Sequence, residues 1–266
     1  MHTIAGLAIL AGFCCHIRMN DLTDNNNEYT VLVTGANRGI GFEFVKQYAA
    51  KGWYVVAGAR DPRGAADLLA LTQEYPKVTI EQLDVSELDF IDALAAKLSG
   101  QPIDLLINNA GYFGEFANQA FGAIDHELFD LFMRTNARGP LKMSEAFVPH
   151  LKAGRYKKIV AITSQAGSFG LDSGGLPGMY FYKSSKAALN MIMRNVAKDV
   201  SENGIAVAVL SPGMVNTAGD DVPPERRFPG LIEPPESIAG MIGVIDRLSL
   251  DNTGNFIRYT DEPQPW

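Results

Sequence analysis

Tyr182 and Lys186 are the two residues whose types and spacing most directly suggest chemistry. They lie four residues apart in Tyr-Phe-Tyr-Lys-Ser-Ser-Lys, so a helix here would place both side chains on one face. An ammonium group beside a phenol stabilises the phenolate and lowers the phenol pKa toward neutrality, which suits the pair to general acid–base catalysis. The spacing is common by chance, and a surface tyrosine–lysine contact is the alternative. Tyr180 is a rival, but the residue four positions after it is Ser184.

Three other polar positions follow or interrupt apolar segments. Ser164 ends the run 159–163, where its hydroxyl could hydrogen-bond a substrate carbonyl or simply cap a turn. Asn108-Asn-Ala-Gly111 ends another run, and its asparagines could tie neighbouring strands and line a cleft, or form a plain turn. Asn136 falls inside a long helical pattern, where asparagine is unfavourable. We expect it to hold a water beside Lys186; the alternative is that it faces solvent.

The stretch Thr34-Gly-Ala-Asn-Arg-Gly-Ile-Gly41 has the character of a phosphate-binding turn. It follows a short apolar run and opens into a helical pattern. Gly35 lets the chain leave the strand sharply, while Gly39 and Gly41 allow backbone to approach a pyrophosphate and the helix to pack on the strand. The free N–H groups at the start of the helix would then face the phosphates.

Strand and helix patterns alternate from residue 30 onward. Short apolar runs predict buried parallel strands at 30–34, 54–58, 78–83, 104–108, 158–163, 205–211 and 256–259. Helical patterns lie between them at about 39–51, 63–74, 86–98, 126–152, 181–202 and 235–248. The alternation predicts an α/β fold: a single-domain, doubly wound parallel sheet of about seven strands with helices on both faces. Ligands of such a sheet gather at the carboxyl ends of its strands.

Composition narrows the class of protein further. The chain has 266 residues, 47% hydrophobic and 20% charged, which suits one domain with a substantial core. Its net charge of −7 argues against a nucleic-acid partner. The four histidines are scattered and show no metal-ligand spacing, so we expect no metal site. The only cysteines are the neighbours Cys14 and Cys15, which favours a reducing, cytoplasmic location.

Residues 1–28 form a predicted N-terminal extension ahead of a domain at 29–266. The apolar part of the extension, 4–17, is too short for a membrane span and lacks a basic start, so we expect no membrane association of the mature domain. Three interpretations stay open: a weak signal or anchor segment, an extension that packs elsewhere, and a true start at Met19, which we favour slightly. Proline pairs within 214–235 interrupt the alternation and predict a substrate loop or lid.

Taken in order, these motifs resemble those of the short-chain dehydrogenases/reductases. The motifs are Thr34-Gly-Ala-Asn-Arg-Gly-Ile-Gly41, Asn108-Asn-Ala-Gly111, Asn136, Ser164, Tyr182-Lys-Ser-Ser-Lys186 and Ser211-Pro-Gly-Met-Val-Asn-Thr217. The resemblance covers about residues 29–266 and implies a Rossmann-type fold. The segment Gly254–Trp266 is similar to that of the C-factor-like subgroup, which includes carbonyl reductases.

The resemblance implies a catalytic role for four residues. Tyr182 would be the general acid that protonates a substrate carbonyl oxygen, or the base in the reverse direction. Lys186 would lower the pKa of Tyr182 and bind the nicotinamide ribose, and Ser164 would polarise the carbonyl. Asn136 would hold the water that links Lys186 to solvent. Ser164 and Tyr182 are farther apart here than is usual in the family, which leaves Ser168 as an alternative serine.

The resemblance also implies which residues bind a nicotinamide cofactor. Pro212-Gly213 would pass beside the nicotinamide, Thr217 would bind its carboxamide, and Asp84-Val85 would contact the adenine. The complete predicted set is Gly35, Asn37, Arg38, Gly39, Ile40, Gly41, Arg60, Asp84, Val85, Asn108, Ala110, Gly111, Tyr182, Lys186, Pro212, Gly213, Val215 and Thr217.

Two arginines indicate which cofactor this would be. Family members that prefer NAD place an acid at the end of the second strand, where it binds the ribose 2′-OH. Here Ala59 occupies that position, Arg60 follows it, and Arg38 lies in the glycine turn near the same ribose. Two guanidinium groups suit a 2′-phosphate, so we predict NADP(H). NAD(H) is the alternative if Asp61 takes the acid's place, although Asp61 also fits a helix cap before Pro62.

Together these residues predict an NADPH-dependent oxidoreductase that reduces an aldehyde or ketone to an alcohol. A set of apolar side chains favours a small hydrophobic substrate: Tyr112, Phe113, Phe116, Phe169, Leu171, Met179, Tyr180, Met214 and Phe228. Two alternatives stay open, a cofactor-binding signalling or regulatory protein of the C-factor-like type and alcohol dehydrogenation in a biosynthetic pathway.

The resemblance further implies a homodimer or homotetramer. Members of the family often associate through two long helices, which correspond here to 126–152 and 181–202. An apolar stripe recurs at helical spacing in the second of them, at Leu189, Ile192, Val196 and Val200. The stripe fits such an interface, and it equally fits contact with the helix's own sheet.

Overall fold

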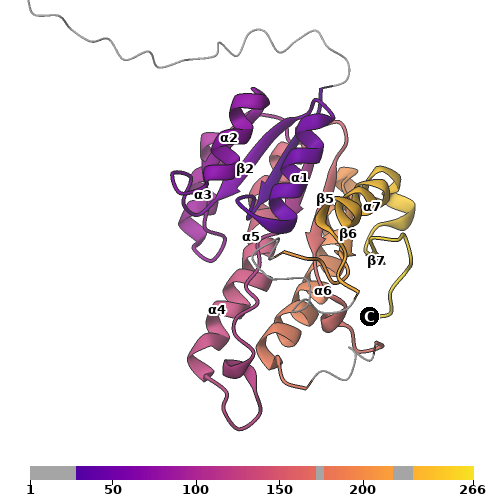
Figure 1. Ribbon diagram of the computed structural model, residues 1–266. Coiled ribbons are helices and arrows are strands. Elements are labelled where there is room, and N and C mark those ends of the chain that lie inside the picture. Colours follow the sequence, from indigo (N-terminus) through magenta and orange to yellow (C-terminus); the bar gives the residue numbers. More distant parts are fainter. Residues whose placement is uncertain (1–27, 172–176, 218–229) are drawn as a thin grey trace, which may run out of the picture.

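In the part of the chain that the structure describes, seven strands form one parallel sheet in the order β3-β2-β1-β4-β5-β6-β7 (Figure 1). The computed structural model describes residues 28–171, 177–217 and 230–266. The strands are β1 (Thr30–Thr34), β2 (Tyr54–Ala59), β3 (Val78–Gln82), β4 (Leu105–Asn108), β5 (Lys158–Ile162), β6 (Ala206–Ser211) and β7 (Asn255–Arg258). The helices are α1 (Gly39–Ala50), α2 (Ala66–Glu74), α3 (Leu88–Lys97), α4 (Phe129–Met133), α5 (Gly139–Ala153), α6 (Tyr180–Val200) and α7 (Pro234–Arg247). The predicted seven-stranded parallel sheet is confirmed.

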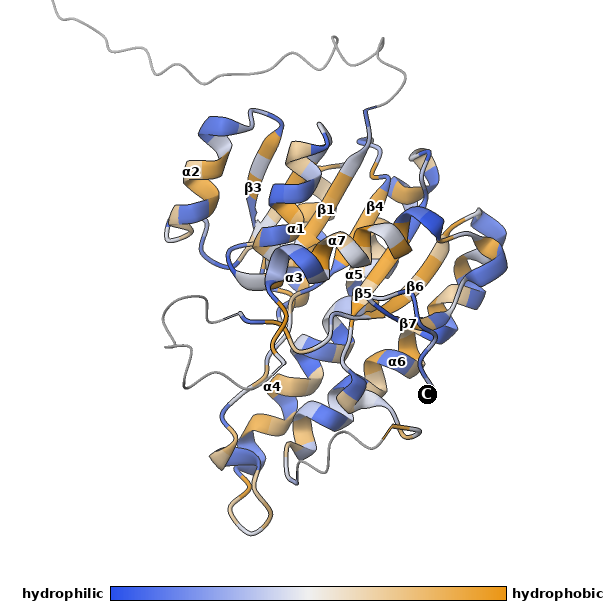
Figure 2. Ribbon diagram, turned by 45° about the vertical axis from the view of Figure 1, so that its right-hand side comes forward, coloured by the Kyte–Doolittle hydropathy of each residue, from blue (hydrophilic) through white to orange (hydrophobic). Residues whose placement is uncertain are grey.

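The sheet separates two layers of helices. Helices α1, α2 and α7 bury side chains such as Phe44 on one face, and α3, α5 and α6 bury side chains such as Phe147 on the other. Alternation along β1 lets a single strand serve both layers, because Val31 and Val33 face the first layer and Leu32 faces the second. Figure 2 accordingly shows a hydrophobic sheet between helices that carry hydrophilic residues on their outer sides. The prediction of helices on both faces is confirmed.

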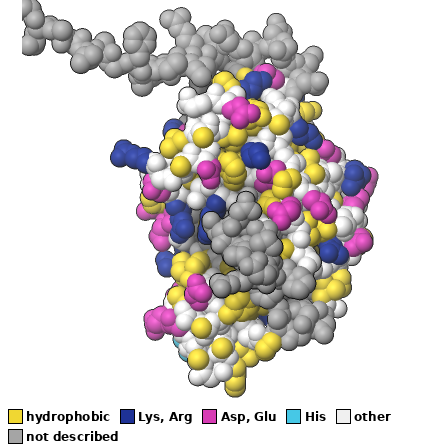
Figure 3. All heavy atoms as spheres, in the orientation of Figure 1, with side chains coloured by type: hydrophobic (Ala, Val, Ile, Leu, Met, Phe, Trp, Pro, Cys, Tyr) yellow, Lys and Arg dark blue, Asp and Glu magenta, His cyan; other side chains and the backbone are white. Residues whose placement is uncertain are grey.

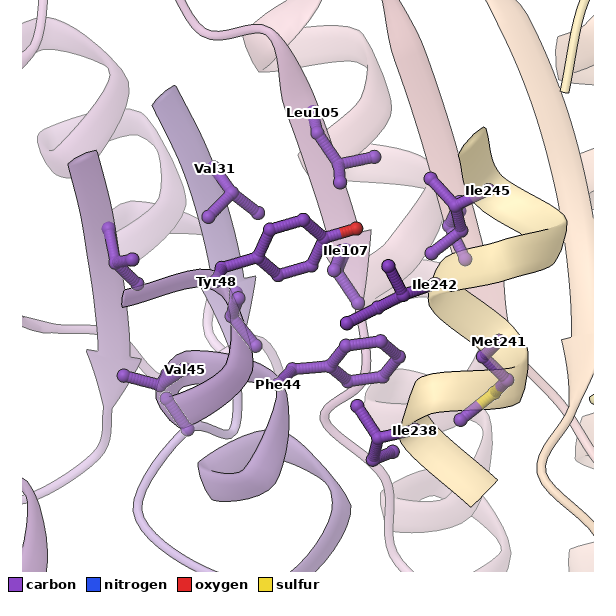
Figure 4. Close-up of a cluster of buried hydrophobic side chains, with 14 of the residues drawn as sticks. Val31, Phe44, Val45, Tyr48, Leu105, Ile107, Ile238, Met241, Ile242 and Ile245 are labelled. Carbon is purple, nitrogen blue, oxygen red and sulfur yellow. The ribbon is translucent and has the colours of Figure 1, made fainter. Parts of the chain in front are cut away.

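Helices α1 and α7 lie side by side although they come from opposite ends of the domain. Phe44 and Tyr48, one helical turn apart on α1, meet Ile238, Ile242 and Ile245 of α7 (Figure 4). All five side chains are at most 5% exposed. Truncating a buried phenylalanine typically costs about 3–5 kcal/mol, so this contact contributes strongly to stability. It also fixes the helix whose first turn borders the site described below.

The apolar stripe of α6 faces its own sheet. Leu189, Val196 and Val200 are at most 7% exposed and belong to the core on that face of the sheet. Ile192 is partly buried against the same core. Of the two interpretations of the stripe, contact with the sheet is therefore confirmed, and the stripe offers no support for an interface between copies.

The helix predicted over 126–152 is interrupted in its middle. Between α4 and α5 the chain forms a π-helical turn, Arg134–Arg138. Pro140 carries no N–H group, so the carbonyl of Asn136 has no α-helical donor four residues on. The Asn136 side chain is fully buried and hydrogen-bonds both backbone groups of Tyr112, which excludes the interpretation that it faces solvent. Turns of this kind occur frequently at functional sites.

Helix α2 begins at Ala66, later than the residue 63 predicted from sequence. The carboxylate of Asp61 accepts a hydrogen bond from the backbone N–H of Arg63 at 3.1 Å, which closes a turn ahead of the helix. The expectation that Asp61 caps this helix is therefore wrong, because its oxygen is used in the preceding turn.

At the amino edge of the sheet, one carboxylate joins three chain segments. Asp104 is 4% exposed and immediately precedes β4. Its Oδ2 accepts from the N–H of Thr30 at 2.9 Å, at the start of β1. Its Oδ1 accepts from the N–H groups of Arg155 at 2.7 Å and Tyr156 at 3.0 Å, ahead of β5. Asp104 thus fixes the central strands relative to one another on the side of the sheet away from the site.

Replacing Asp104 with alanine should destabilise the domain. The substitution leaves three partly buried backbone N–H groups without their acceptor, for which we expect a loss of about 3 kcal/mol in the free energy of unfolding. Urea unfolding followed by circular dichroism measures this loss. Asp199→Ala, at an exposed position of α6, is the control and should change stability by less than about 0.5 kcal/mol. Equal stabilities for the two variants would contradict the prediction.

Candidate active site

Segments that follow four strands meet at the carboxyl edge of the sheet. The glycine turn follows β1, residues 109–115 follow β4, Ser164 follows β5, and 212–217 follow β6. The chain order reverses between β1 and β4, which are neighbours at the centre of the sheet, and doubly wound sheets open their ligand crevice at such a point. A cavity of about 630 Å³ lies here. Of the predicted residues, those that line it are Gly35, Asn37, Arg38, Gly39, Ile40, Gly41, Arg60, Asp84, Val85, Ala110, Gly111, Tyr182, Lys186, Pro212 and Thr217.

The glycine turn has no room for side chains at its critical positions. A Cβ atom on Gly41 would lie 2.2 Å from the carbonyl oxygen of Gly35. Gly35 has a φ of +64°, and its Cβ would lie 2.8 Å from the Cα of Ala110. Gly39 also has a positive φ, +56°. Backbone therefore forms this wall of the cavity, and the amino end of α1 brings its N–H groups and partial positive charge to the same wall.

Asn109 and Thr34 tie the ends of the two central strands together. The Nδ2 of Asn109 donates to the carbonyl oxygens of Thr34 at 2.9 Å and Gly35 at 3.1 Å. The Oγ1 of Thr34 accepts from the N–H groups of Asn109 and Ala110, each at 3.0 Å. The expected tie between neighbouring strands thus exists, but Asn109 makes it. Asn108 instead turns its amide toward Ser144 at 3.5 Å, and its side chain is not among the cavity-lining ones in the described residues.

Two arginines border the cavity beside the second strand. Arg38 immediately precedes α1, and Arg60 follows β2 directly. Both line the cavity. Ala59, the last residue of β2, is only 1% exposed and offers no acid at this position. The Asp61 carboxylate is turned to its own loop, where it accepts from the N–H of Arg63. The end of β2 therefore presents the charged Arg60 to the cavity, and the glycine turn after β1 adds Arg38.

Ser164, Tyr182 and Lys186 come together beside the end of β5. The Ser164 hydroxyl hydrogen-bonds the Tyr182 phenol and accepts from the N–H of Ala166 at 3.1 Å, so it both caps a turn and contacts the tyrosine. The Nζ of Lys186 donates to the carbonyl of Ile162 at 2.9 Å and lies 5.8 Å from the centroid of the Tyr182 ring. Tyr182 and Lys186 therefore share one helical face, as their spacing predicts.

Ser168 and Tyr180, the two rival residues, are engaged elsewhere. The Ser168 hydroxyl donates to the carbonyl of Pro265 at 2.7 Å. The Tyr180 ring is 42% exposed and lies 6.1 Å from the ring of Phe121. The geometry therefore favours Ser164 and Tyr182 as the partners at this site.

Burial shifts the pKa values of Tyr182 and Lys186 in opposite directions. It raises the pKa of the Tyr182 phenol, and the hydrogen bond from Ser164 lowers that pKa only in part. It lowers the pKa of the Lys186 ammonium from 10.5 to about 8. A net lowering of the phenol pKa, as the sequence suggested, is therefore not what this environment produces, because desolvation of the phenolate outweighs the favourable contacts. The buried lysine becomes the stronger acid of the two.

Asn136 lies against the same cluster but outside the cavity wall. Its Oδ1 accepts from the N–H of Tyr112 at 2.7 Å, and its Nδ2 donates to the Tyr112 carbonyl at 2.8 Å. The second Nδ2 hydrogen goes to the Oγ of Ser185 at 2.9 Å. A Cβ on Gly111 would lie 3.5 Å from the Asn136 Oδ1 and 3.6 Å from the Lys186 Nζ, so both groups border one point. The side chain thus anchors a loop to α6, and water binding by Asn136 stays a prediction.

Some residues at the cavity were missed by the sequence analysis, and some predicted ones lie beside it. Gly213 and Val215 are not among the cavity-lining residues that the structure describes; Val215 instead forms a bridge with Ile232. Thr163 lines the cavity and was not predicted. Its position directly before Ser164 at a strand end was the available signal. Gln119, which contacts Tyr182, lies in no motif and could not be found from the sequence.

Aromatic side chains border the cavity next to Tyr182. The Phe113 ring lies edge-on to the Tyr182 ring, with centroids 4.7 Å apart, and Phe113 lines the cavity. Phe116 packs against Phe113 at 5.3 Å. Figure 3 shows hydrophobic side chains at the end of the molecule that carries the segment between β4 and α4. In this segment Phe121 is exposed, and Phe129 at the start of α4 is exposed as well. Of the predicted apolar set, Tyr112 and Phe113 reach the cavity among the described residues.

Parts of three predictions fall on residues outside the described ranges. They are the N-terminal extension through residue 27, positions 172–176 of the long segment between Ser164 and Tyr182, and 218–229 of the predicted substrate loop, including Phe228. In the part of the chain that is described, no helix has the length and apolar character needed to cross a membrane. The same part holds no group of three His, Cys, Asp or Glu side chains placed as metal ligands.

Comparison with known proteins agrees with this architecture. A family model described as short chain dehydrogenase matches residues 29–225. The chain is 36% identical over 231 residues to 1-hydroxy-2-glutathionyl-2-methyl-3-butene dehydrogenase of Rhodococcus sp. (strain AD45), which covers 85% of this chain and 95% of that protein. It is 36% identical over 174 residues to the C-signal protein of Myxococcus xanthus, covering 65% of this chain and 99% of that one. The NADPH-bound carbonyl reductase from chicken fatty liver superposes with a TM-score of 0.81 at 33% identity, over 90% of this chain and 100% of that one.

The fold and the site define a Rossmann-type oxidoreductase, with a glycine turn and a Tyr–Lys pair on one cavity. Because the family model matches most of its length, the chain belongs to the short-chain dehydrogenase family. Within that family it resembles C-signal and the carbonyl reductases, as its sequence motifs predict.

The buried Lys186 should make folding stability depend on pH. Between pH 8 and 10.5 the unfolded chain binds a proton at this lysine that the folded protein does not, so the free energy of unfolding rises with pH. The gain is at most about 3 kcal/mol across this window. Urea unfolding should show the wild type gaining this stability relative to Lys186→Met, with the exposed Lys198→Met as control. A wild-type to Lys186→Met difference that does not change with pH would contradict the prediction.

Proposed function

We propose that this chain uses NADPH to reduce a hydrophobic aldehyde or ketone to an alcohol, with residues 29–266 as the oxidoreductase domain. The proposal depends chiefly on one observation: Tyr182 and Lys186 line the same cavity as the glycine turn, and Ser164 hydrogen-bonds Tyr182. A proton donor beside a phosphate-binding turn is the arrangement that carbonyl reduction requires.

The cavity has the groups that a dinucleotide needs. The close-packed glycine turn is a cradle that any Cβ would fill, and the start of α1 offers N–H groups to a pyrophosphate. Arg38 and Arg60 suit a 2′-phosphate, which favours NADP(H) over NAD(H). The chicken carbonyl reductase that superposes on this chain was solved with NADPH bound, which supports the same choice. When bound, the nicotinamide supplies the hydride.

Tyr182 acts as the general acid. Its raised pKa keeps the phenol protonated at neutral pH, so it can donate a proton to the substrate carbonyl oxygen as the alkoxide forms. Ser164, whose hydroxyl contacts the phenol, turns its single hydrogen to the same substrate oxygen and polarises the carbonyl. The two hydroxyl groups therefore place and activate the carbonyl together.

Lys186 returns the proton to Tyr182. Burial lowers its pKa to about 8 while raising that of the phenol, so transfer from the ammonium to the phenolate is downhill. The Asn136 main-chain carbonyl, which has no α-helical donor because residue 140 is proline, is a suitable acceptor for a water that links Lys186 to solvent. This path restores the proton of the Tyr182 phenol after each turnover.

Two relatives support other uses of the same site. The Rhodococcus relative is named as a dehydrogenase, which favours the reverse reaction, alcohol oxidation with Tyr182 as base. The C-signal relative has a name that indicates signalling, which favours a regulatory protein that binds the cofactor. NADPH binding without turnover on a broad panel of aldehydes, ketones and alcohols would favour the regulatory alternative.

Tyr182→Phe should remove most of the carbonyl reduction. Loss of a general acid lowers kcat by about 100-fold or more, while binding of NADPH should stay within about twofold of wild type. The measurement is NADPH oxidation with a panel of aromatic and aliphatic aldehydes and ketones, with NADPH fluorescence titration for binding. Tyr180→Phe, two residues away and partly exposed, is the control and should retain activity. Full activity of Tyr182→Phe would exclude the proposed mechanism.

Arg38→Ala and Arg60→Ala should each weaken NADPH binding by about tenfold, because each removes a charge-assisted contact to the 2′-phosphate. Binding of NADH should change little, so the preference for NADPH shrinks in both variants. Fluorescence titration with the two cofactors measures this, with the exposed Arg63→Ala as control. Equal binding of NADH and NADPH by the wild type would show that the 2′-phosphate assignment is wrong.

A further inference from the structure

Gln119 is a fully buried amide that joins two parts of the site. Its side chain has 0% exposure, and it ends a short 3₁₀ turn that belongs to none of the motifs described above. The Nε2 donates to the carbonyl oxygen of Phe113 at 3.0 Å and, more weakly, to that of Glu115 at 3.5 Å. The Oε1 accepts from the backbone N–H of Tyr182 at 3.0 Å. One side chain thus connects the loop after β4 to the helix that carries the proposed acid.

The hydrogen bond between Gln119 and the Tyr182 N–H caps the first turn of α6. The first N–H groups of a helix lack partners within the helix, and an N-cap side chain usually supplies one. Here the N-cap is Met179, in a left-handed conformation (φ +55°), and its side chain has no oxygen to accept a hydrogen bond. Gln119 supplies the acceptor from a distant part of the chain. The first turn of α6, and with it Tyr182, is therefore fixed by a residue of the opposite wall.

The hydrogen bonds from the Nε2 of Gln119 hold the loop after β4, which faces the proposed substrate site. Phe113 lines the cavity and places its ring against that of Tyr182, with 43% of its surface exposed. Gly114 has a φ of +68°, and a Cβ there would lie 2.6 Å from the Phe132 ring and 3.3 Å from the Gln119 Nε2. The loop is thus close-packed behind Phe113, and Gln119 is part of what it packs on.

We propose that Gln119 is a positioning residue that holds Phe113 at a fixed separation from Tyr182 and so sets the space open to the substrate's apolar group. The inference rests on the proposed function, because it concerns the substrate of that same site. A flat apolar group next to the reacting carbonyl would lie against the Phe113 ring, so the class favoured is aryl aldehydes and aryl ketones over branched aliphatic ones.

The effect of Gln119 should be confined to the substrate side. Asn136 independently holds the neighbouring Tyr112 through both of its backbone groups, and it reaches α6 through Ser185. The glycine turn is held by Asn109. Loss of Gln119 therefore frees Phe113 and the backbone N–H of Tyr182, whereas the glycine turn of the proposed cofactor site stays held by Asn109.

Gln119→Met, of similar size but without the three hydrogen bonds, tests the proposal. We expect the KM for 4-nitrobenzaldehyde to rise about tenfold, since a wall displaced by about 1 Å loses its fit, while the KM for NADPH stays within about twofold. The preference for 4-nitrobenzaldehyde over 2-methylpropanal should fall in parallel. Asn118→Ala, at the neighbouring amide, is the control. An unchanged KM for the aldehyde, or equal changes in both KM values, would overturn the proposal.

Gln119→Glu makes the KM for the aldehyde depend on pH, an effect that a purely structural role of Gln119 would not produce. A buried carboxyl group has a raised pKa. While protonated it can accept from the Tyr182 N–H and donate to the Phe113 carbonyl, as glutamine does; once ionised it loses the donor. The KM for 4-nitrobenzaldehyde, divided by the wild-type value at the same pH, should therefore rise with pH for Gln119→Glu and stay constant for Gln119→Met. A constant ratio in both variants would overturn the proposal.

A measurement without turnover separates this inference from the proposed function. In protein labelled with 4-fluorophenylalanine, the ¹⁹F signal of Phe113, assigned with Phe113→Leu, reports its contact with the Tyr182 ring. We expect Gln119→Met to move this signal and Asn118→Ala to leave it in place. No reduction of any carbonyl by the wild type would reject the proposed function, whereas an unmoved ¹⁹F signal would reject the role of Gln119.

Discussion

The site depends first on how closely two pieces of backbone approach at the carboxyl ends of β1 and β4. Gly41 packs on the carbonyl of Gly35, and Gly35 packs on the backbone of Ala110, at distances that exclude any Cβ. This contact seats the first turn of α1 directly on the strand ends, so the helix N-terminus forms one wall of the cavity. The packing of α1 against α7 in the core then holds that wall in place.

In the loops at the site, side-chain amides hydrogen-bond the backbone groups that strand pairing would satisfy within the sheet. Loops at strand ends expose backbone groups that must find partners when buried. Asn109 pairs with the glycine turn, Asn136 with Tyr112, and Gln119 with Phe113. Asn136 and Gln119 also reach α6, so the loop after β4 and the helix of Tyr182 and Lys186 form one connected unit. Such a unit holds Tyr182 and Lys186 at a fixed position relative to Phe113 of the loop after β4.

Burial also decides which of Tyr182 and Lys186 has the higher pKa. Free tyrosine and lysine have similar pKa values near 10. In this environment desolvation favours the neutral form of each side chain, which strengthens Lys186 as an acid and weakens Tyr182. In the proposed reaction, this order of pKa values lets Lys186 reprotonate Tyr182. The desolvated lysine opposes folding below pH 8, a cost that the apolar core on both faces of the sheet offsets.

The sequence by itself determined the sheet, its two helical layers, and the glycine turn with Tyr182 and Lys186, because these follow from hydrophobic periodicity and spacings of a few residues. The hydrogen bonds that the side chains of Asn136 and Gln119 make were decided only by the tertiary structure. Each depends on a partner far along the chain, Tyr112 for Asn136 and Tyr182 for Gln119, at separations of 24 and 63 residues. Local propensity describes what a segment prefers alone, whereas a buried amide takes its position from whichever distant backbone groups folding leaves unpaired beside it.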